Sequence, residues 1–311
     1  MFPLGNSHKA VFIYIYLQDL FLQEEEITMK KKIISMLLAA AMVCTCFVGC
    51  GSKVDESSSD IDVSATDVSS SEPIDISNLK LIKDGTLTVG MEIGYPPFED
   101  KAEDGTAIGY DVDMIYAIGD KLGLEINLID TAFDLIFAGL GTNYDCIVSA
   151  VTITDERQEQ ALFSTPYIEN YQAVAVKKGS DIKIESLQDL SGHSVMLQKG
   201  TTSQELLEDM IETGTVTNCT MAATEQILTC FTALDNGEYE IVLCDSTVAA
   251  NYVTMSPDKY EIAYIDDQYP EQFGIAMGKE DTALQTAINE AMAQLKEEGF
   301  FEENNAKWFA E

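Results

Sequence analysis

Apolar positions along the chain follow two spacings, one typical of buried strands and one typical of amphipathic helices. Short, nearly continuous apolar runs predict strands covered on both faces, and they occupy residues 86–90, 125–129, 146–151, 171–176, 194–197, 240–244, 260–265 and 273–277. Apolar residues three and four apart predict helices over residues 112–122, 133–140, 224–234 and 246–253, another that begins just after Thr202, and a last one that stops at Gly299. Because strands and helices alternate, the pattern predicts an α/β protein with mainly parallel sheets.

The alternation runs through the chain twice, with a polar break at Lys177–Ser180 between the two rounds. The last strand and helix are left over, and their simplest place is the first unit. We therefore expect two lobes joined by two crossings, near residues 170–176 and 264–272, with a cleft between the lobes. The predicted boundaries assign residues 79–172 and 268–311 to lobe 1 and residues 173–267 to lobe 2.

Groups that attract an anion follow the predicted strand at residues 146–151. Thr152, Thr154 and Arg157 lie in a polar loop that opens a helix. Ligands of open parallel sheets bind outside the carboxyl ends of the strands. Hydroxyls, free backbone N–H groups and one guanidinium at such an end predict a site for a carboxylate.

The second round of the pattern has polar groups at corresponding positions. Thr202 and Glu205 have the spacing of a capping box, so the first N–H groups of the next helix point out of the loop before it. Asp245 ends the predicted strand 240–244. Plainer interpretations stay open: Arg157 as a solvated helix residue, Asp245 and Thr202 as helix caps, and Tyr95 and Phe133 as core residues.

Composition excludes several classes of function. The 311 residues include 18 Lys+Arg against 53 Asp+Glu, a net charge of −35. We expect no nucleic-acid binding, because such a chain cannot neutralise phosphates, and the acidity instead keeps the surface solvated. The only histidines, His8 and His193, and the cysteine spacing give no metal-ligand pattern, so we expect neither a metal nor a cofactor.

Four cysteines follow Cys50 in the sequence. Cys146 and Cys244 lie inside apolar runs and are expected to be buried thiols. Cys219 and Cys230 are a candidate disulfide, since an extracytoplasmic protein permits one.

The N-terminal region has the features of a targeting segment. A basic run begins after Met29, an apolar run follows, and Gly49-Cys50 ends it, which predicts a secretory signal peptide over residues 29–49. The signal resembles that of bacterial lipoproteins, and this resemblance makes Cys50 the lipidated first residue. Residues 50–78, rich in Ser and Asp, are predicted to be a flexible tether. Residues 1–28 are predicted to be leader from a mis-assigned start, with a real extension as the alternative; a plain transmembrane anchor also stays open.

From about Leu79 to Phe309, the chain resembles the extracellular solute-binding proteins of ABC transporters that take polar amino acids. The resemblance rests on TLTVGMEIGYPPFE, GYDVDMIYAIGDKLG, FDLIFAGLGTNYDCIVSAVTITDERQEQALFSTPY, DLSGHSVMLQKGTTSQE, ALDNGEYEIVLCDS, FGIAM and KWF. It implies a type II periplasmic-binding-protein-like fold, in which each lobe is a mainly parallel sheet flanked by helices and two hinge strands cross between the lobes. It also implies a binding protein and not an enzyme.

The resemblance assigns roles to residues of the predicted cleft. Arg157 pairs with the ligand α-carboxylate, helped by the N–H or hydroxyl of Thr152 and an N–H of Thr202, while Asp245 takes the α-ammonium. The other implied ligand residues are Tyr95 and Phe133, which stack on the ligand side chain, Glu92 and Gln198, which select it, and Ala150, whose carbonyl accepts from the ammonium.

The implied function is the capture of a free amino acid outside the cytoplasmic membrane and its delivery to an ABC permease. Glu92 favours a cationic or amide side chain, while cystine-like ligands stay open; the alternative for Glu92 is a solvent-facing residue. We expect a monomer attached through lipid on Cys50. Two alternatives remain, a sensory binding domain without transport and an extracytoplasmic dehydratase of prephenate-like acids.

Overall fold

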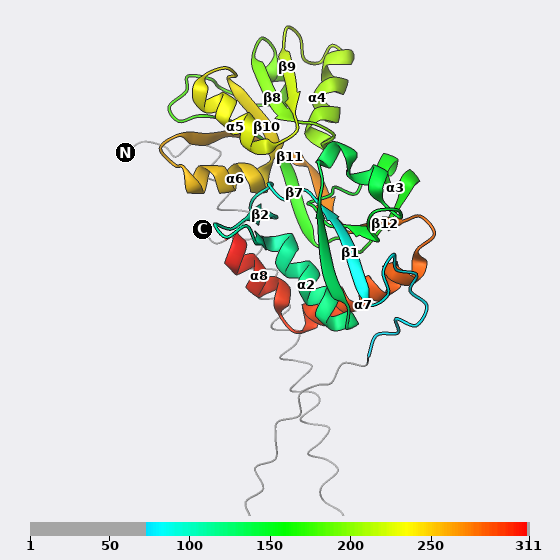
Figure 1. Cartoon of the computed structure of the whole chain (residues 1–311). Coiled ribbons are helices and arrows are strands. Elements are labelled where there is room, and N and C mark those ends of the chain that lie inside the picture. The colour runs from blue at the N-terminus through cyan, green and yellow to red at the C-terminus, as the bar shows by residue number, and fades with distance from the viewer. Residues whose placement is uncertain (1–72, 310–311) are drawn as a thin grey trace, which may run out of the picture. The chain divides into compact units, whose positions relative to one another are not determined.

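The computed structural model describes residues 73–309, which form two five-stranded sheets with helices packed on them (Figure 1). The elements are β1 (Thr86–Met91), β2 (Asp100–Lys101), β3 (Ala107–Ile108), α2 (Tyr110–Leu122), β4 (Glu125–Asp130), the 3₁₀ helix η1 (Phe133–Gly139), β5 (Cys146–Ile147), α3 (Asp155–Gln160), β6 (Ala161–Phe163), β7 (Ile168–Lys177), the 3₁₀ helix η2 (Leu187–Leu190), β8 (Ser194–Gln198), α4 (Thr202–Glu212), β9 (Thr220–Thr224), α5 (Ile227–Asn236), β10 (Ile241–Asp245), α6 (Ser246–Met255), β11 (Tyr260–Phe273), β12 (Ala276–Gly278), α7 (Thr282–Glu297) and α8 (Phe300–Trp308). The predicted leader, signal peptide and lipidation site lie outside the described residues, as does most of the tether.

The first sheet has the strand order β4-β1-β5-β12-β6. Its strand β1 pairs in parallel with β4 and β5, whereas β12 runs antiparallel to β5 and β6. The strand left over by the sequence alternation therefore joins the first sheet. Helices α2, α7 and α8 gather beside this sheet in Figure 1.

The second sheet has the strand order β11-β7-β10-β8-β9. Its long strands β7 and β11 pair antiparallel and run side by side through the centre of Figure 1. The chain passes between the sheets twice, at 164–167 and at 274–275, and the two passages are hydrogen-bonded, Ser164 N to Ile275 O at 2.9 Å. The α/β class is confirmed, but both sheets are mixed, because β12 in the first sheet and β7 in the second run antiparallel to both of their neighbours.

Some predicted elements differ from those in the structure. The predicted helix 133–140 is the 3₁₀ helix η1, and the start of the predicted helix 224–234 belongs partly to strand β9. The predicted strand 146–151 is only two residues long, because beyond Ile147 the chain turns away and Ala150 adopts a φ of 46°. The apolar residues that follow Ile147 are buried in loop conformation, which an apolar run cannot distinguish from a strand.

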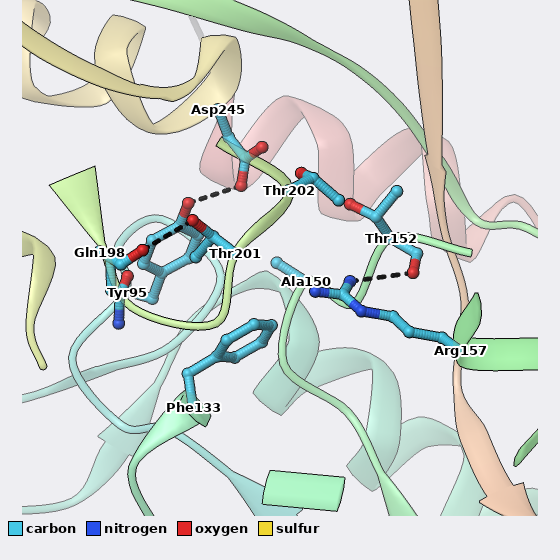
Figure 2. A pocket seen from close by; sticks show the side chains of 9 residues that line it. All are labelled: Tyr95, Phe133, Ala150, Thr152, Arg157, Gln198, Thr201, Thr202 and Asp245. Carbon is cyan, nitrogen blue, oxygen red and sulfur yellow. Dashed lines mark hydrogen bonds between the residues drawn. The ribbon is translucent and has the colours of Figure 1, made fainter. Parts of the chain in front are cut away.

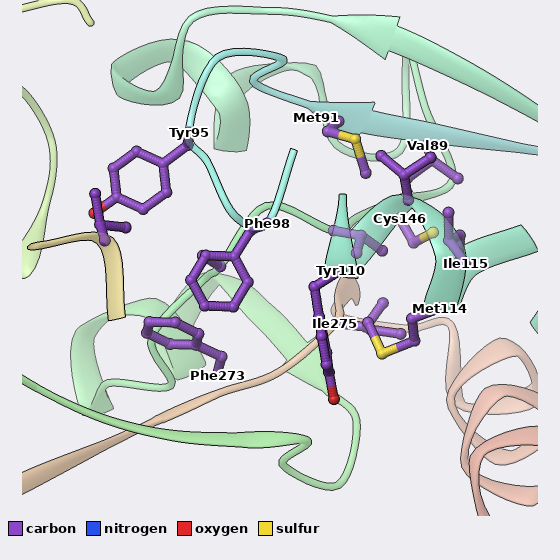
Figure 3. Close-up of a cluster of buried hydrophobic side chains, with 14 of the residues drawn as sticks. Val89, Met91, Tyr95, Phe98, Tyr110, Met114, Ile115, Cys146, Phe273 and Ile275 are labelled. Carbon is purple, nitrogen blue, oxygen red and sulfur yellow. The ribbon is translucent and has the colours of Figure 1, made fainter. Parts of the chain in front are cut away.

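An aromatic cluster lies in the core at the end of β11 (Figure 3). Phe98, which follows β1, is fully buried, and its ring centroid lies 5.3 Å from that of Phe273 at the end of β11 and 6.1 Å from that of Tyr110 at the start of α2. These edge-to-face contacts are worth about 0.5–1.5 kcal/mol each beyond area burial. They fix the loop after β1 against the strand that leads back to the first sheet.

All four cysteines among the described residues are free thiols. Cys146 and Cys244 are buried, as predicted. The candidate disulfide between Cys219 and Cys230 is wrong, because the two residues pack in different hydrophobic clusters. Burial raises the pKa of the Cys230 thiol to about 12.

Within residues 73–309, no helix is both long and apolar enough to cross a membrane.

Candidate functional site

A pocket lies between loops and short helices that follow strands of the first sheet and the carboxyl ends of β8 and β10 of the second (Figure 2). Its lining consists of Tyr95, Phe133, Ala150, Thr152, Arg157, Gln198, Thr201, Thr202 and Asp245. Eight of the nine residues predicted to contact a ligand are in this set, and Glu92 is the ninth.

Arg157 is the only arginine of the whole sequence, and it is buried at the edge of the pocket with 6% of its surface exposed. It lies on the short helix α3, whose N-cap Thr154 accepts a hydrogen bond from the Arg157 N–H at 3.1 Å. Its Nη1 donates to the Thr152 carbonyl at 3.0 Å, and its Nη2 donates to the Gly200 carbonyl, also at 3.0 Å. A guanidinium has five N–H donors, so these two bonds orient the group and leave donors for an anion.

The guanidinium of Arg157 also lies over two aromatic rings of η1. Its Cζ atom is 5.5 Å from the centroid of Phe133 and 5.8 Å from that of Phe137. Such cation–π contacts stabilise a partly desolvated charge. Burial lowers the pKa of Arg157, but an arginine stays protonated at neutral pH. Phe133 therefore supports the cation and also forms part of the pocket wall.

Asp245 ends β10 on the opposite side of the pocket and is also buried. Its Oδ2 accepts from the Tyr95 hydroxyl at 2.5 Å, and its Oδ1 accepts from Asn170 Nδ2 at 2.7 Å. Burial, and next the charge of Glu271, raise the pKa of Asp245 to about 7. Asp245 occupies the N-cap position of α6, but its side chain makes no cap hydrogen bond. The plainer interpretation is therefore correct for the position of Asp245, but its side-chain oxygens accept from Tyr95 and Asn170 and not from the N–H groups of the helix.

The loop before α4 contributes two threonines to the pocket. The N-cap of α4 is Thr201, whose side chain accepts from the Gln204 N–H at 3.3 Å, so the predicted cap at Thr202 is wrong by one residue. Thr202 is instead the first residue of the helix, where its backbone N–H has no partner inside the helix. Thr201 also lines the pocket and was not among the predicted residues, although it lies in the same Gly-Thr-Thr turn as Thr202.

Glu92 and Gln198 form a contact at the other end of the pocket. Glu92 follows β1 and does not line the pocket, but its Oε2 accepts from Gln198 Nε2 at 2.6 Å. Glu92 is 5% exposed, which excludes the interpretation as a solvent-facing residue. Burial raises the pKa of Glu92 to about 7, against the opposite effect of the Gln198 hydrogen bond.

Two buried carboxyl groups hold the loop that carries Ala150. Asp111 Oδ2 accepts from the Ala150 N–H at 2.8 Å, and Glu99 Oε1 accepts from the Ser149 hydroxyl at 2.7 Å. Burial raises the pKa of Asp111 to about 7 and that of Glu99 well above its usual range. These bonds keep Ala150 in its left-handed backbone conformation. Neither carboxyl group is predicted from the sequence, because nothing in its pattern separates them from the many exposed acids.

The comparison with protein families is decisive for the class of this site. Residues 87–311 match bacterial extracellular solute-binding proteins, family 3. The chain belongs to this family.

Within residues 73–309, no group of three or more His, Cys, Asp or Glu side chains could hold a metal ion.

Individual relatives of this family 3 protein are amino-acid-binding proteins by name. It is 32% identical over 233 residues to the L-cystine-binding protein TcyJ of Escherichia coli strain K12, an alignment that covers 74% of this chain and 85% of TcyJ. It is 28% identical over 229 residues to the ABC transporter arginine-binding protein 1 of the same strain, covering 72% and 90% of the two chains. A solved structure of an ancestral arginine-binding protein bound to arginine is similar with a TM-score of 0.68 and 35% identity, covering 73% of this chain and 99% of that one. The predicted type II periplasmic-binding-protein fold is therefore confirmed.

Proposed function

We propose that this family 3 protein binds one free amino acid in the pocket and closes its two lobes around it. The observation that carries the proposal is that Arg157 on α3 and Asp245 at the end of β10 both line one pocket. A guanidinium and a carboxylate at opposite sides match the two charges of an amino acid zwitterion. Arg157 with Thr152 and Thr202 binds the α-carboxylate, and Asp245 with the Ala150 carbonyl binds the α-ammonium.

The ligand side chain lies between Tyr95 and Phe133 and reaches toward Glu92 and Gln198. Because Glu92 is a carboxyl group, it favours a cationic or amide side chain, such as that of arginine, lysine, ornithine, histidine or glutamine. A cystine-like ligand is the second class, and the similarity to TcyJ, named for L-cystine, supports it. A micromolar dissociation constant corresponds to about −8 kcal/mol, which one desolvated zwitterion with stacking can supply.

Binding favours the closed state because the ligand touches both lobes only there. We assign residues 79–172 and 268–311 to lobe 1 and residues 173–267 to lobe 2, so the boundaries fall within the paired strands β7 and β11 of the second sheet. Arg157 Nη2 donates to Gly200 O at 3.0 Å, and this contact between α3 and the loop before α4 supports the proposed closure. The closed protein then delivers the amino acid to an ABC permease, and it acts as a monomer and not as an enzyme.

The site of action is the outer surface of the cytoplasmic membrane of a bacterium. Residues 29–49 direct export, lipid on Cys50 holds the protein at the membrane, and residues 50–78 act as the tether; residues 1–28 are leader. The variant Cys50→Ala tests the anchor. The variant should be released into the culture medium, whereas the wild-type protein should stay with the cells and incorporate labelled fatty acid. Retention of the variant at the membrane would contradict the anchor alone.

Thermal-shift measurements of the purified protein against a panel of the common amino acids and cystine test the function. Stabilisation by one amino acid or a related group, confirmed by calorimetric titration, is expected. Indifference to the whole panel contradicts the proposal and favours a sensory domain for another ligand or a dehydratase. A dehydratase needs a general acid positioned at the substrate and a site that binds two carboxylates. The carboxyl group of Asp245 opposite Arg157 disfavours binding of a second carboxylate.

A further inference from the structure

Glu271 is a carboxylate that lies behind two threonines of the pocket wall. It belongs to β11, and its Oε2 accepts from Thr152 Oγ1 at 2.9 Å and from Thr202 Oγ1 at 3.0 Å. Glu271 does not line the ligand pocket. It lines a separate depression that Thr152 and Thr202 also border, so the two threonines separate Glu271 from the ligand pocket.

The chemistry of these contacts fixes the direction of both hydroxyl groups. A hydroxyl has one hydrogen to donate, and an ionised carboxylate can only accept. Thr152 and Thr202 therefore direct their hydrogens toward Glu271 and can offer only oxygen lone pairs to the pocket. Thr202 Oγ1 also accepts from Gln172 Nε2 at 3.2 Å, which agrees with this orientation.

We propose that Glu271 is a positioning residue that sets the polarity of Thr152 and Thr202, so that their hydroxyls accept from the α-ammonium of the ligand instead of donating to its carboxylate. The inference rests on the proposed function and sharpens it, since it makes the pocket selective for an acid that carries an α-amino group. The carboxylate is left to Arg157 and to backbone N–H groups. The Thr152 hydroxyl, expected from the sequence as one possible donor to the carboxylate, thus becomes an acceptor, and only the Thr152 N–H is left to donate to the carboxylate.

Gln172 holds Glu271 in place and connects it to Asp245. Its Nε2 donates to Glu271 Oε1 at 2.8 Å and lies 3.5 Å from Asp245 Oδ1. Its Oε1 accepts from the Ser203 hydroxyl at 2.6 Å, which fixes the orientation of the amide. Gln172 thus links two carboxyl groups, Glu271 and Asp245, to the hydroxyls of Thr152 and Thr202.

The variant Glu271→Gln should reverse the two hydroxyls. The new amide keeps its oxygen toward the donating Gln172 Nε2, so its NH₂ group faces the threonines and the threonine hydrogens turn toward the pocket. The ratio of affinities for an amino acid and for its analogue without the α-amino group should then fall about tenfold or more. The probe pairs are L-arginine with δ-guanidinovalerate, L-lysine with ε-aminocaproate, and L-cystine with dithiodipropionate, measured by calorimetric titration.

Glu261→Gln is the matched control. Glu261 lies on the same strand, and its Oε2 pairs with Lys178 Nζ at 3.0 Å in a surface contact away from the pocket. The substitution Glu261→Gln removes the same charge and should leave unchanged the ratio of affinities for the amino acid and for its analogue without the α-amino group. A wild-type protein that binds an amino acid while Glu271→Gln keeps the wild-type ratio overturns the role of Glu271 and leaves the proposed function standing. A wild-type protein that binds none of the amino acids overturns both.

Thr152 provides a second test that does not depend on the folding of a Glu271 variant. Thr152→Val removes the hydroxyl and should weaken binding of the amino acid about tenfold without changing the affinity for the analogue that lacks the α-amino group. Thr152→Ser keeps the hydroxyl and should retain the wild-type ratio. Equal losses for both probes in Thr152→Val would show that the hydroxyl contacts the carboxylate and would contradict the inference.

Discussion

The hydroxyl of Tyr95 donates to Asp245 Oδ2 at 2.5 Å, although the two residues are 150 positions apart in the sequence. Tyr95 belongs to the loop after β1 of the first sheet, and Asp245 ends β10 of the second. The bond therefore joins a loop of the first sheet to the end of a strand of the second within the wall of the pocket. It also connects the ring expected to stack on the ligand side chain with the carboxylate expected to bind the ammonium.

Tyr95→Phe should weaken amino-acid binding about tenfold, because the closed state loses a hydrogen bond to a charged group, a bond worth about 1.5–3 kcal/mol. The same bond lowers the pKa of Asp245, so its loss should move the acid limb of the affinity–pH profile to higher pH. Titration calorimetry at several pH values measures both effects. An affinity and a pH profile equal to those of the wild type would show that the bond has no role in closure.

Gly200→Ala should weaken ligand binding by blocking closure. Gly200 has a φ of 73°, and an added Cβ would lie 2.9 Å from Asp134 Cα on the opposite side of the pocket. Gly214 has a φ of 76° but nothing within 4 Å of such a Cβ, so Gly214→Ala is a matched control. Both variants should lose about 1 kcal/mol of stability from the backbone conformation, and only Gly200→Ala should lose affinity. Equal affinities in the two variants would contradict closure at this contact.

Arg157→Ala should abolish amino-acid binding and leave the unliganded protein folded. The substitution removes the charge-assisted pair with the α-carboxylate, and such losses typically exceed 2 kcal/mol or about thirtyfold in affinity. Arg157→Lys keeps the charge without the bidentate geometry and should be intermediate. Calorimetric titration and the melting temperature without ligand separate binding from folding. Undiminished affinity in Arg157→Ala would refute the carboxylate site.

Ligand affinity should rise with pH between about 5 and 8. Glu92 and Asp245 both have pKa values raised to about 7, and each must be ionised to pair with a cation. A bound ammonium lowers these pKa values, so binding at pH 7 should release protons, which titrations in buffers of different ionisation enthalpy will detect. Proton uptake, or an affinity that is constant over this range, would contradict the assignment of the two groups.

The same groups give the unliganded protein the opposite pH dependence of stability. Carboxyl groups of an unfolded chain have pKa values near 4. The raised values of Glu92, Asp111 and Asp245 mean that the folded state binds more protons than the unfolded state between about pH 4 and pH 7. Their contribution to stability is therefore present at low pH and is lost as pH rises through this interval. Melting temperatures without ligand, measured across the interval in Asp245→Asn and in the wild type, isolate the part due to Asp245.

The sequence by itself determined the α/β class, the position of most strands and helices, and the family. It also identified eight of the nine residues that line the pocket. The reason is that apolar spacing reflects burial within one element, and the ends of strands and starts of helices are where polar groups remain available for a ligand. The order of the motifs along the chain identified the family.

Only the tertiary structure decided which distant side chains meet. The contacts of Glu92 with Gln198, of Gln172 with Glu271, and of Glu271 with the two pocket threonines join segments far apart in the sequence. No local pattern distinguishes Glu271 from the other acids among the 53 of this chain, because its role comes from its neighbours in space. The direction in which each hydroxyl points, and the raised pKa of each buried carboxyl group, follow from that packing alone.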